Sequence, residues 1–304
     1  LIQMKKDYSI NRYIFILLLL FMKISIYGQT LEEMINRKIR EVKADVGVAI
    51  IINSKDTLAI NNEHNYPMLS TYKVHQAMKV VDYLREKSVP LTKEIEIPAS
   101  QLKSNTYSPL QQKYPSGVTL PVSEILRYSL QLSDNNACDI LFSIAGGPMV
   151  VNRYLESIGV HDCNVAYTED EMRQDINRAY DNWTTPLEGA RVLEKLFCGI
   201  EIGDDQYSSF IKEILYNSKT GEKRIPCLLP KDILKIAHKT GTGPKKEDGS
   251  ILGVNDIGFI ELPNGKHYSI AIFIKDSYED MQRNELLIAE ISESAAIFPK
   301  ISIL

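Results

Sequence analysis

Apolar residues recur with helical spacing in three parts of the chain. Residues 30–33 read Thr-Leu-Glu-Glu, the pattern of a capping box, and open a helix with an apolar face. From about 66 to 218 the helical period dominates, interrupted by loops rich in Pro, Asn and Ser around 97–118 and 162–186. A last helix is predicted over 277–298.

Short apolar runs near both ends of the chain predict β-strands. They cover residues 46–52, 57–60, 233–238, 251–262 and 267–274. Strands from both ends around a helical middle predict a single α+β catalytic domain over 29–304. Residues 29–65 and 219–304 would form an α/β lobe, residues 66–218 an inserted all-α lobe, and the active site would lie between the lobes.

Residues 1–28 have the pattern of a secretory signal peptide. Three basic residues precede an apolar run over 13–22, and Gly28 supplies a small residue before the polar Gln29-Thr30. The run is about half of what a membrane-spanning helix needs, which favours cleavage over a permanent anchor. We therefore expect a secreted, periplasmic protein that has no membrane contact after cleavage.

Charge and residue usage exclude several classes of function. Residues 1–28 carry +3 and the remainder −7, within a whole-chain charge of −4, so the mature part has no basic character for nucleic-acid binding. The five histidines are dispersed, and no cysteine pair or neighbouring histidine has metal-ligand spacing. We expect no metal or other cofactor. Export would permit disulfides, and spacing does not decide whether any pair forms, but buried free thiols are favoured for all four cysteines: Cys138, Cys163, Cys198 and Cys227.

The motif Ser-x-x-Lys occurs three times, and its context distinguishes the copies. The copy at 100–103 lies in a loop between prolines, and in the copy at 209–212 the serine faces solvent on a predicted helix. Ser70 instead opens a helix, where free backbone N–H groups and the positive helix end stabilise an oxyanion. Lys73, one turn later on the same face, can approach the hydroxyl of Ser70 and assist its deprotonation.

Two further motifs follow in a fixed order. Residues 133–135 read Ser-Asp-Asn, in which Ser133 could pass a proton to a leaving nitrogen and Asn135 could bind a substrate carbonyl. Lys-Thr-Gly occurs at 219–221, after a helix, and at 239–241, at the end of a predicted strand. We favour the second copy, because a strand end can line a cleft and bind a carboxylate-bearing substrate.

Together, the three motifs in this order resemble those of class A serine β-lactamases, as do Tyr-Ser-Pro at 107–109 and Asn-Trp-Thr at 182–184. The likeness covers essentially the whole mature chain and is greatest to the branch that contains the CfxA, CblA and PER cephalosporinases. It implies a monomer with a five-stranded antiparallel sheet flanked by helices, small-molecule β-lactam substrates, and a serine acyl-enzyme mechanism that gives antibiotic resistance.

The resemblance also implies a role for each site residue. Ser70 would attack the lactam carbonyl, with the amides of Ser70 and Thr242 as the oxyanion hole, while Ser133 and Lys73 deliver a proton to the ring nitrogen. Asn135 would bind the amide side chain of the substrate. The remaining substrate-binding positions would be Tyr107, Arg224, Lys239, Thr240, Gly241 and Thr242.

A glutamate separates such hydrolases from transpeptidases. In the segment 168–173, Thr-Glu-Asp-Glu-Met-Arg, the likeness makes Glu169 the base that hydrolyses the acyl-enzyme, with Glu171 or a merely solvated acidic loop as alternatives. Arg173 stands where many relatives carry an asparagine that helps hold the deacylating water. Whether Lys73 or Glu169 is the base in acylation stays open. A penicillin-binding D,D-peptidase and a non-catalytic β-lactam sensor are the alternative functions.

Overall fold

The structure, a computed structural model, describes residues 30–230 and 234–298. The predicted signal peptide lies outside the described residues. Within those residues, no helix combines the length and the apolar character needed to cross a membrane.

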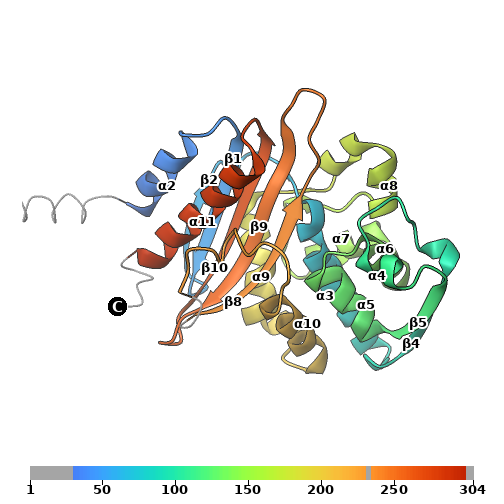
Figure 1. The fold of residues 1–304 in the computed structure, drawn as a ribbon. Helices are drawn as coiled ribbons and strands as arrows, with labels where there is room; N and C mark the ends of the chain where they lie inside the picture. Colours follow the sequence, from blue (N-terminus) through green and yellow to red (C-terminus); the bar gives the residue numbers. More distant parts are fainter. Residues whose placement is uncertain (1–29, 231–233, 299–304) are drawn as a thin grey trace, which may run out of the picture.

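A five-stranded antiparallel sheet forms one side of the molecule (Figure 1). Its order is β2-β1-β10-β9-β8, so strands from the two ends of the chain lie side by side at its centre. The sequence-based prediction of this sheet and of the α+β class is confirmed. The strands are β1 (Asp45–Ile52), β2 (Asp56–Ile60), β8 (Lys235–Thr242), β9 (Ile251–Glu261) and β10 (His267–Ser277).

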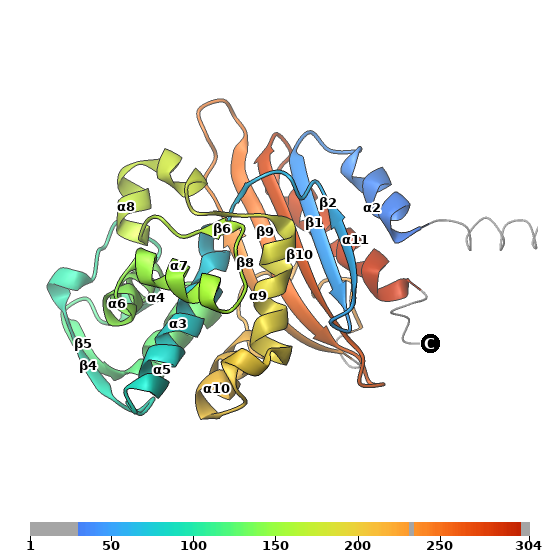
Figure 2. The same cartoon turned by 180° about the vertical axis from the view of Figure 1, so that it is seen from behind.

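Both faces of the sheet are covered because its central strands are apolar on both sides. Val48 and Ile50 of β1 pack under α2 and α11, whereas Ala49 and Ile51 belong to the core on the α9 side. Figures 1 and 2 show these two faces in turn. The helices are α2 (Leu31–Ile39), α11 (Met281–Ile297) and α9 (Pro186–Cys198). The predicted capping box at Thr30 is present at the start of α2.

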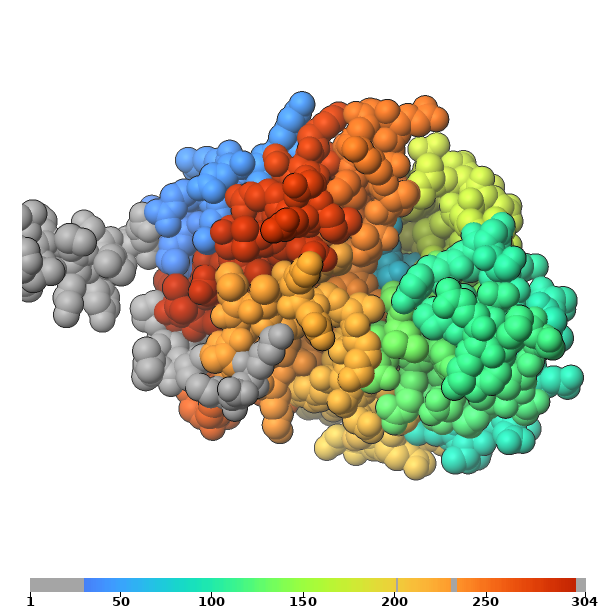
Figure 3. All heavy atoms as spheres, in the orientation of Figure 1, coloured from blue at the N-terminus to red at the C-terminus, as the bar shows by residue number. Residues whose placement is uncertain are grey.

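The other helices form a second lobe beside β8. They are α3 (Tyr72–Glu86), α4 (Pro109–Lys113), α5 (Val122–Gln131), α6 (Asn135–Ala145), α7 (Pro148–Ser157), α8 (Glu169–Gln174) and α10 (Gln206–Tyr216). Short 3-10 turns are η1 (Leu69–Thr71), η2 (Ala99–Gln101), η3 (Ile176–Tyr180) and η4 (Ile200–Ile202). The space-filling view in Figure 3 shows a hollow between the orange strands and the green to yellow helices, with the blue-teal start of α3 at its base.

The segment 66–218 is not wholly helical, and three features correct the prediction. It contains a two-stranded ribbon, β4 (Glu94–Pro98) with β5 (Gly117–Pro121), and the short pairs of β3 (Tyr66–Pro67) and β6 (Cys163–Asn164) with β7 (Trp183–Thr184). Its helix α9 packs on the sheet.

The prediction that the cysteines are buried is also corrected. All four cysteines are free thiols, but only Cys138 is fully buried, while Cys198 and Cys227 are exposed.

Candidate active site

Ser70 lies in the 3-10 turn η1, directly before α3 begins. Leu69 has φ of 51°, a left-handed conformation that non-glycine residues rarely adopt, so the turn carries backbone strain. It is held by the Thr71 hydroxyl, which donates to Met68 O at 2.8 Å, and by Asn255 Nδ2, which donates to the same carbonyl at 3.1 Å. These contacts fix the position of the Ser70 hydroxyl at the base of the cleft.

The ammonium of Lys73, one turn later on α3, is fully buried among oxygen atoms. Its Nζ donates to Ser133 O at 2.9 Å and to Asn135 Oδ1 at 2.7 Å, and lies 3.1 Å from Glu169 Oε1. No other group in the described part of the chain donates a hydrogen bond to Glu169 Oε1. Nζ therefore has three oxygen neighbours, as many as the hydrogen bonds that a lysine ammonium group can donate.

The Ser-Asp-Asn segment joins the helical lobe to the sheet. Lys239, fully buried on β8, donates from Nζ to Ser133 Oγ at 2.8 Å. Because Oγ accepts this bond, the hydrogen of the Ser133 hydroxyl remains free to be donated to another group. Burial, followed by the nearby charge of Lys73, lowers the pKa of Lys239 well below its usual value.

Asp134 is the structural member of the same motif. Its carboxylate caps α6 by accepting from Ala137 N at 2.8 Å, and accepts from Ser108 Oγ at 2.9 Å and Leu110 N at 2.7 Å. Asn135 N in turn donates to Tyr107 O at 3.1 Å. The motif therefore fixes the loop that carries Tyr107 at the edge of the cleft, where this side chain is 56% exposed.

Glu169 and Glu171 have different environments. Glu171 Oε2 accepts from the backbone N–H and hydroxyl of Thr168, so this carboxylate closes a capping box at the start of α8. Glu169 faces Lys73 instead, which distinguishes the two candidates by geometry. Arg173 is turned to Asp170, with Nη2 donating to Oδ1 at 2.6 Å, although it lines a cavity together with Glu169.

The loop that carries Glu169 is bound to the rest of the site at two points. Asn182 Oδ1 accepts from Ala166 N and Tyr167 N at 2.7 and 2.8 Å, and its own carbonyl accepts from Met68 N at 2.7 Å. Asn182 thus connects this loop with the turn that holds Ser70.

Arg224 reaches β8 from the segment after α10. Its Nη1 donates to Gly241 O at 3.0 Å and its Nη2 to Thr242 Oγ1 at 2.7 Å, while Glu285 lies 3.4 Å from Nε. Desolvation lowers the pKa of this buried arginine, but a guanidinium keeps its charge. Gly241 is required sterically, because a Cβ there would lie 2.6 Å from Met68 O.

Two cavities meet at Ser70. The first, of about 200 Å³, is lined by Ser70, Glu169, Arg173 and residues of the neighbouring loops. The second, of about 280 Å³, is lined by Ser70, by Ser133 and by most of the predicted substrate-binding positions: Tyr107, Asn135, Arg224, Thr240 and Thr242. The structure therefore brings the predicted site residues together in one cleft, with Lys73 and Lys239 buried beneath it.

Sequence reasoning missed Thr220 in the first Lys-Thr-Gly copy. This copy does follow a helix, as predicted, but Thr220 Oγ1 lies 2.8 Å from Thr240 Oγ1, and Thr220 and Gly221 line the second cavity. The copy at 219–221 therefore contributes to the cleft beside the copy at 239–241. Its spacing alone gave no signal of this, because the contact depends on the path of the chain after α10.

Sequence reasoning also missed Asp139 on α6. Its carboxylate accepts from Glu169 N at 2.8 Å and Asp170 N at 2.9 Å, which fixes the backbone of the catalytic glutamate candidate. Burial, followed by the charge of Glu169, raises the pKa of Asp139 to about 7.

The raised pKa of Asp139 predicts a pH-dependent contribution to stability. The folded state binds a proton here more tightly than the unfolded chain, so the contribution is full below pH of about 4 and is lost as the pH rises through about 7. Asp139→Asn should remove it. We expect the Tm of the wild type, relative to that of the variant, to fall across this range in thermal unfolding scans. A difference that does not change with pH would contradict the assignment.

The sequence of the chain, compared with those of known proteins, matches one family. The sequence model of the β-lactamase enzyme family matches residues 30–297. The chain belongs to the class A β-lactamases. It is 36% identical to a β-lactamase of Bacteroides uniformis over 86% of this chain and 88% of that protein. It is 33% identical to the extended-spectrum β-lactamase PER-1 of Pseudomonas aeruginosa, over 88% of this chain and 87% of that one.

Solved structures of class A β-lactamases agree with this assignment. The TLA-1 extended-spectrum β-lactamase superposes with a TM-score of 0.84 at 40% identity, over 87% of this chain and 96% of that one. A class A β-lactamase of Bacteroides cellulosilyticus gives a TM-score of 0.83 at 37% identity, over 88% and 97%. The protein is thus a hydrolase of β-lactam rings, as its motifs predicted.

Proposed function

We propose that this β-lactamase acts through a serine acyl-enzyme, with Ser70 as nucleophile and Glu169 as the base that releases the product. The observation that carries the proposal is the position of Ser70, at the junction of two cavities that hold the two sets of groups the reaction needs. One cavity offers a carboxylate to activate water. The other offers hydroxyl and cationic groups to bind the substrate.

The contacts of Lys73 favour Glu169 as the proton acceptor in acylation too. Three oxygen atoms surround Nζ of Lys73, an arrangement that suits a hydrogen-bond donor better than a base for Ser70. Glu169 can receive that proton through one water molecule in the cavity that it shares with Ser70. Before this transfer, Lys73 lies beside the carboxylate of Glu169 and orients it.

Ser133 is placed to protonate the leaving nitrogen of the ring. Its Oγ accepts a bond from Lys239, which leaves the hydrogen of the Ser133 hydroxyl free to be donated to the ring nitrogen. When the ring opens, the carbonyl carbon bonds to Ser70 Oγ, the C–N bond breaks, and the nitrogen takes the proton of Ser133. Ser133 regains a proton from Lys73, and Lys73 takes up the proton held by Glu169, which is then a carboxylate again. Water gives a proton to Glu169 as it attacks the ester, and that proton passes to Ser70 Oγ as the acid product leaves.

The second cavity suits an anionic substrate. Arg224 and the hydroxyl groups of Thr240 and Thr242 line it beside Thr220, and Lys239 is buried beneath the cleft. A carboxylate on the ring fused to the lactam would be bound there. We propose cephalosporins as the favoured substrates, supported by the likeness to PER-1 and TLA-1, which are described as extended-spectrum enzymes.

Turnover and intact mass measured together test the proposal. The protein should hydrolyse a chromogenic cephalosporin with many turnovers and have a higher kcat/KM for cephalosporins than for benzylpenicillin. Rapid quenching should reveal a transient mass increase on the peptide that contains Ser70. A stable adduct with no turnover would instead indicate a peptidase or a sensor, and a preference for penicillins would refute the substrate assignment alone.

Arg224→Ala should weaken substrate binding through the lost cation. Charge-assisted hydrogen bonds are worth about 1.5–3 kcal/mol, so kcat/KM for a carboxylate-bearing cephalosporin should fall about 10- to 100-fold. The matched control is Arg127→Ala, which removes a partly exposed arginine that is paired with Glu213 and lines neither cavity. Steady-state kinetics compare the two variants. Equal losses would show that Arg224 has no special role in recognition.

We also propose that the protein works as a monomer in the periplasm after removal of residues 1–28. The apolar run and the basic residues that precede it support export. Cell fractionation of an expressing Gram-negative host, with amino-terminal sequencing and light scattering of the released protein, tests this. Retention in the cytoplasm would refute the proposed export, and a stable dimer would refute the monomeric state.

A further inference from the structure

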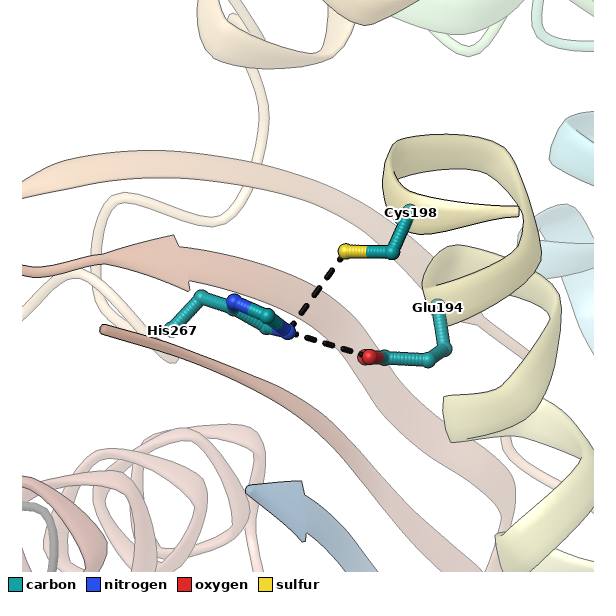
Figure 4. A group of neighbouring side chains, drawn as sticks. All are labelled: Glu194, Cys198 and His267. Atoms are coloured by element: carbon teal, nitrogen blue, oxygen red, sulfur yellow. Dashed lines mark hydrogen bonds and ion pairs between the residues drawn. The ribbon is translucent and has the colours of Figure 1, made fainter. Parts of the chain in front are cut away.

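Three potential metal ligands meet outside the catalytic cleft. Glu194 and Cys198 are four residues apart on α9, so they share one face of that helix. His267 is the first residue of β10, 69 residues beyond Cys198. Figure 4 shows the carboxylate of Glu194 and the sulfur of Cys198 both pointing to the same ring nitrogen of His267.

The distances among these atoms match those of a tetrahedral metal site. His267 Nε2 lies 3.0 Å from Glu194 Oε1 and 3.5 Å from Cys198 Sγ, and one ligand atom from each residue lies within 4.8 Å of the others. Zinc bonds of about 2.0 Å to oxygen and nitrogen and about 2.3 Å to sulfur place tetrahedral ligands about 3.3 Å (O to N) and about 3.5 Å (S to N) apart. Only small side-chain shifts separate the observed positions from coordination.

The same geometry argues against a catalytic Cys-His-Glu relay. In such a relay the imidazole presents one nitrogen to the nucleophile and the other to the carboxylate. Here Glu194 and Cys198 both approach Nε2. Atoms that converge on one point are arranged to share a cation, not to pass a proton along a chain.

Neighbouring side chains fix the orientation of two of the ligands. Glu194 Oε2 accepts from Ser269 Oγ at 2.6 Å, and Glu194 Oε1 accepts from Ser54 Oγ at 2.5 Å. The ring of His267 stacks on Phe259, with centroids 5.1 Å apart. Such outer contacts are typical of metal ligands, because they reduce the entropy lost on binding.

The cluster is partly buried and opens to solvent on one side. The side chains of Glu194 and His267 are 12% and 20% exposed, and Cys198 is exposed. A cavity of about 350 Å³ adjoins the cluster and leaves room for water as a fourth ligand. Arg191 and Lys195 also line this cavity, and Arg191 is paired with Glu188 at 2.5 Å.

We propose that Glu194, Cys198 and His267 form a site for a divalent transition-metal ion, with zinc the best match. A thiolate, an imidazole and a carboxylate together suit zinc better than magnesium or calcium, which prefer oxygen ligands alone. The bound ion would join the end of α9 to the start of β10 and stabilise that packing. The expectation of no metal rested on the absence of cysteine and histidine pairs at metal-ligand spacing along the chain. The fold, however, brings His267 next to Cys198 from 69 residues away.

Zinc titration of the purified protein tests the site. After treatment with a chelator, calorimetry with zinc chloride should show one ion bound per chain. Saturating zinc, at about a hundredfold excess over the Kd, should raise the Tm by about 5 °C or more. Cobalt should give the thiolate charge-transfer absorption and the visible bands of a tetrahedral site.

Matched cysteine variants assign the binding. Cys198→Ser and His267→Gln should lose the bound ion and the rise in Tm, whereas Cys227→Ser, which removes another exposed thiol, should keep both. Zinc should also protect Cys198 from alkylation. All three variants should hydrolyse cephalosporin at the wild-type rate, which shows that they are folded. Unchanged zinc binding in Cys198→Ser, or a Kd weaker than millimolar in the wild type, would overturn the proposal.

Discussion

Replacing Ser70 by alanine is expected to lower kcat/KM for a chromogenic cephalosporin by about 10⁴-fold or more. Without the hydroxyl, no acyl-enzyme can form, and the well-placed cations and hydroxyl groups around the cleft have no nucleophile to assist. Kinetic assays measure the loss. Intact-mass spectrometry should detect no adduct of the variant with any β-lactam.

Ser209→Ala is the matched control for this loss. Ser209 begins another Ser-x-x-Lys copy, but it lies exposed on α10 and lines neither of the two cavities at Ser70. This variant should retain wild-type turnover and stability. A covalent adduct in Ser70→Ala, or a comparable loss in Ser209→Ala, would remove Ser70 from its assigned role.

Glu169→Gln is expected to convert the enzyme into a trap for its substrate. Glutamine cannot accept a proton from the attacking water, so deacylation should slow by about 10²- to 10⁴-fold. Acylation should also slow if Glu169 is the first base, but slow release should still let the adduct accumulate. Mass spectrometry after mixing should show a persistent acylated species, and steady-state kcat should fall in parallel.

Glu171→Gln is the control for this change. The amide oxygen of glutamine can still accept from Thr168, as the carboxylate does in the capping box of α8, so the loop should keep its structure. Turnover should remain close to that of the wild type. An acylated species that accumulates in Glu171→Gln and not in Glu169→Gln would reverse the two assignments.

The sequence predicted the strands and the start of the first helix well, because both depend on local patterns. Alternating and continuous apolar runs located β1, β9 and β10 to within a few residues. Among the repeated motifs, the copy containing Ser70 could be chosen because helix position is a local property. The β4–β5 ribbon was missed, since its short strands lie within a segment of loops and helices.

Other residues could not be found because their roles arise from tertiary contacts. Asp139 acts on the backbone of Glu169, 30 residues later, and Thr220 meets Thr240 only after the chain returns to the sheet. The residues next to each of them in the sequence form no pattern that indicates these contacts. The distinction between Glu169 and Glu171 likewise required coordinates, because each is acidic and both lie in the first turn of α8.

The pairing of β1 with β10 has a consequence for how the chain folds. Val48 is paired with Ile272, so the centre of the sheet closes only when nearly the whole chain has been synthesised. Contacts so distant in sequence are slow to form, because a long loop must be ordered first. The helical segment between them can collapse early. The residues of β8 that line the cleft would then reach their positions only when the sheet has formed, so activity should report completion of folding.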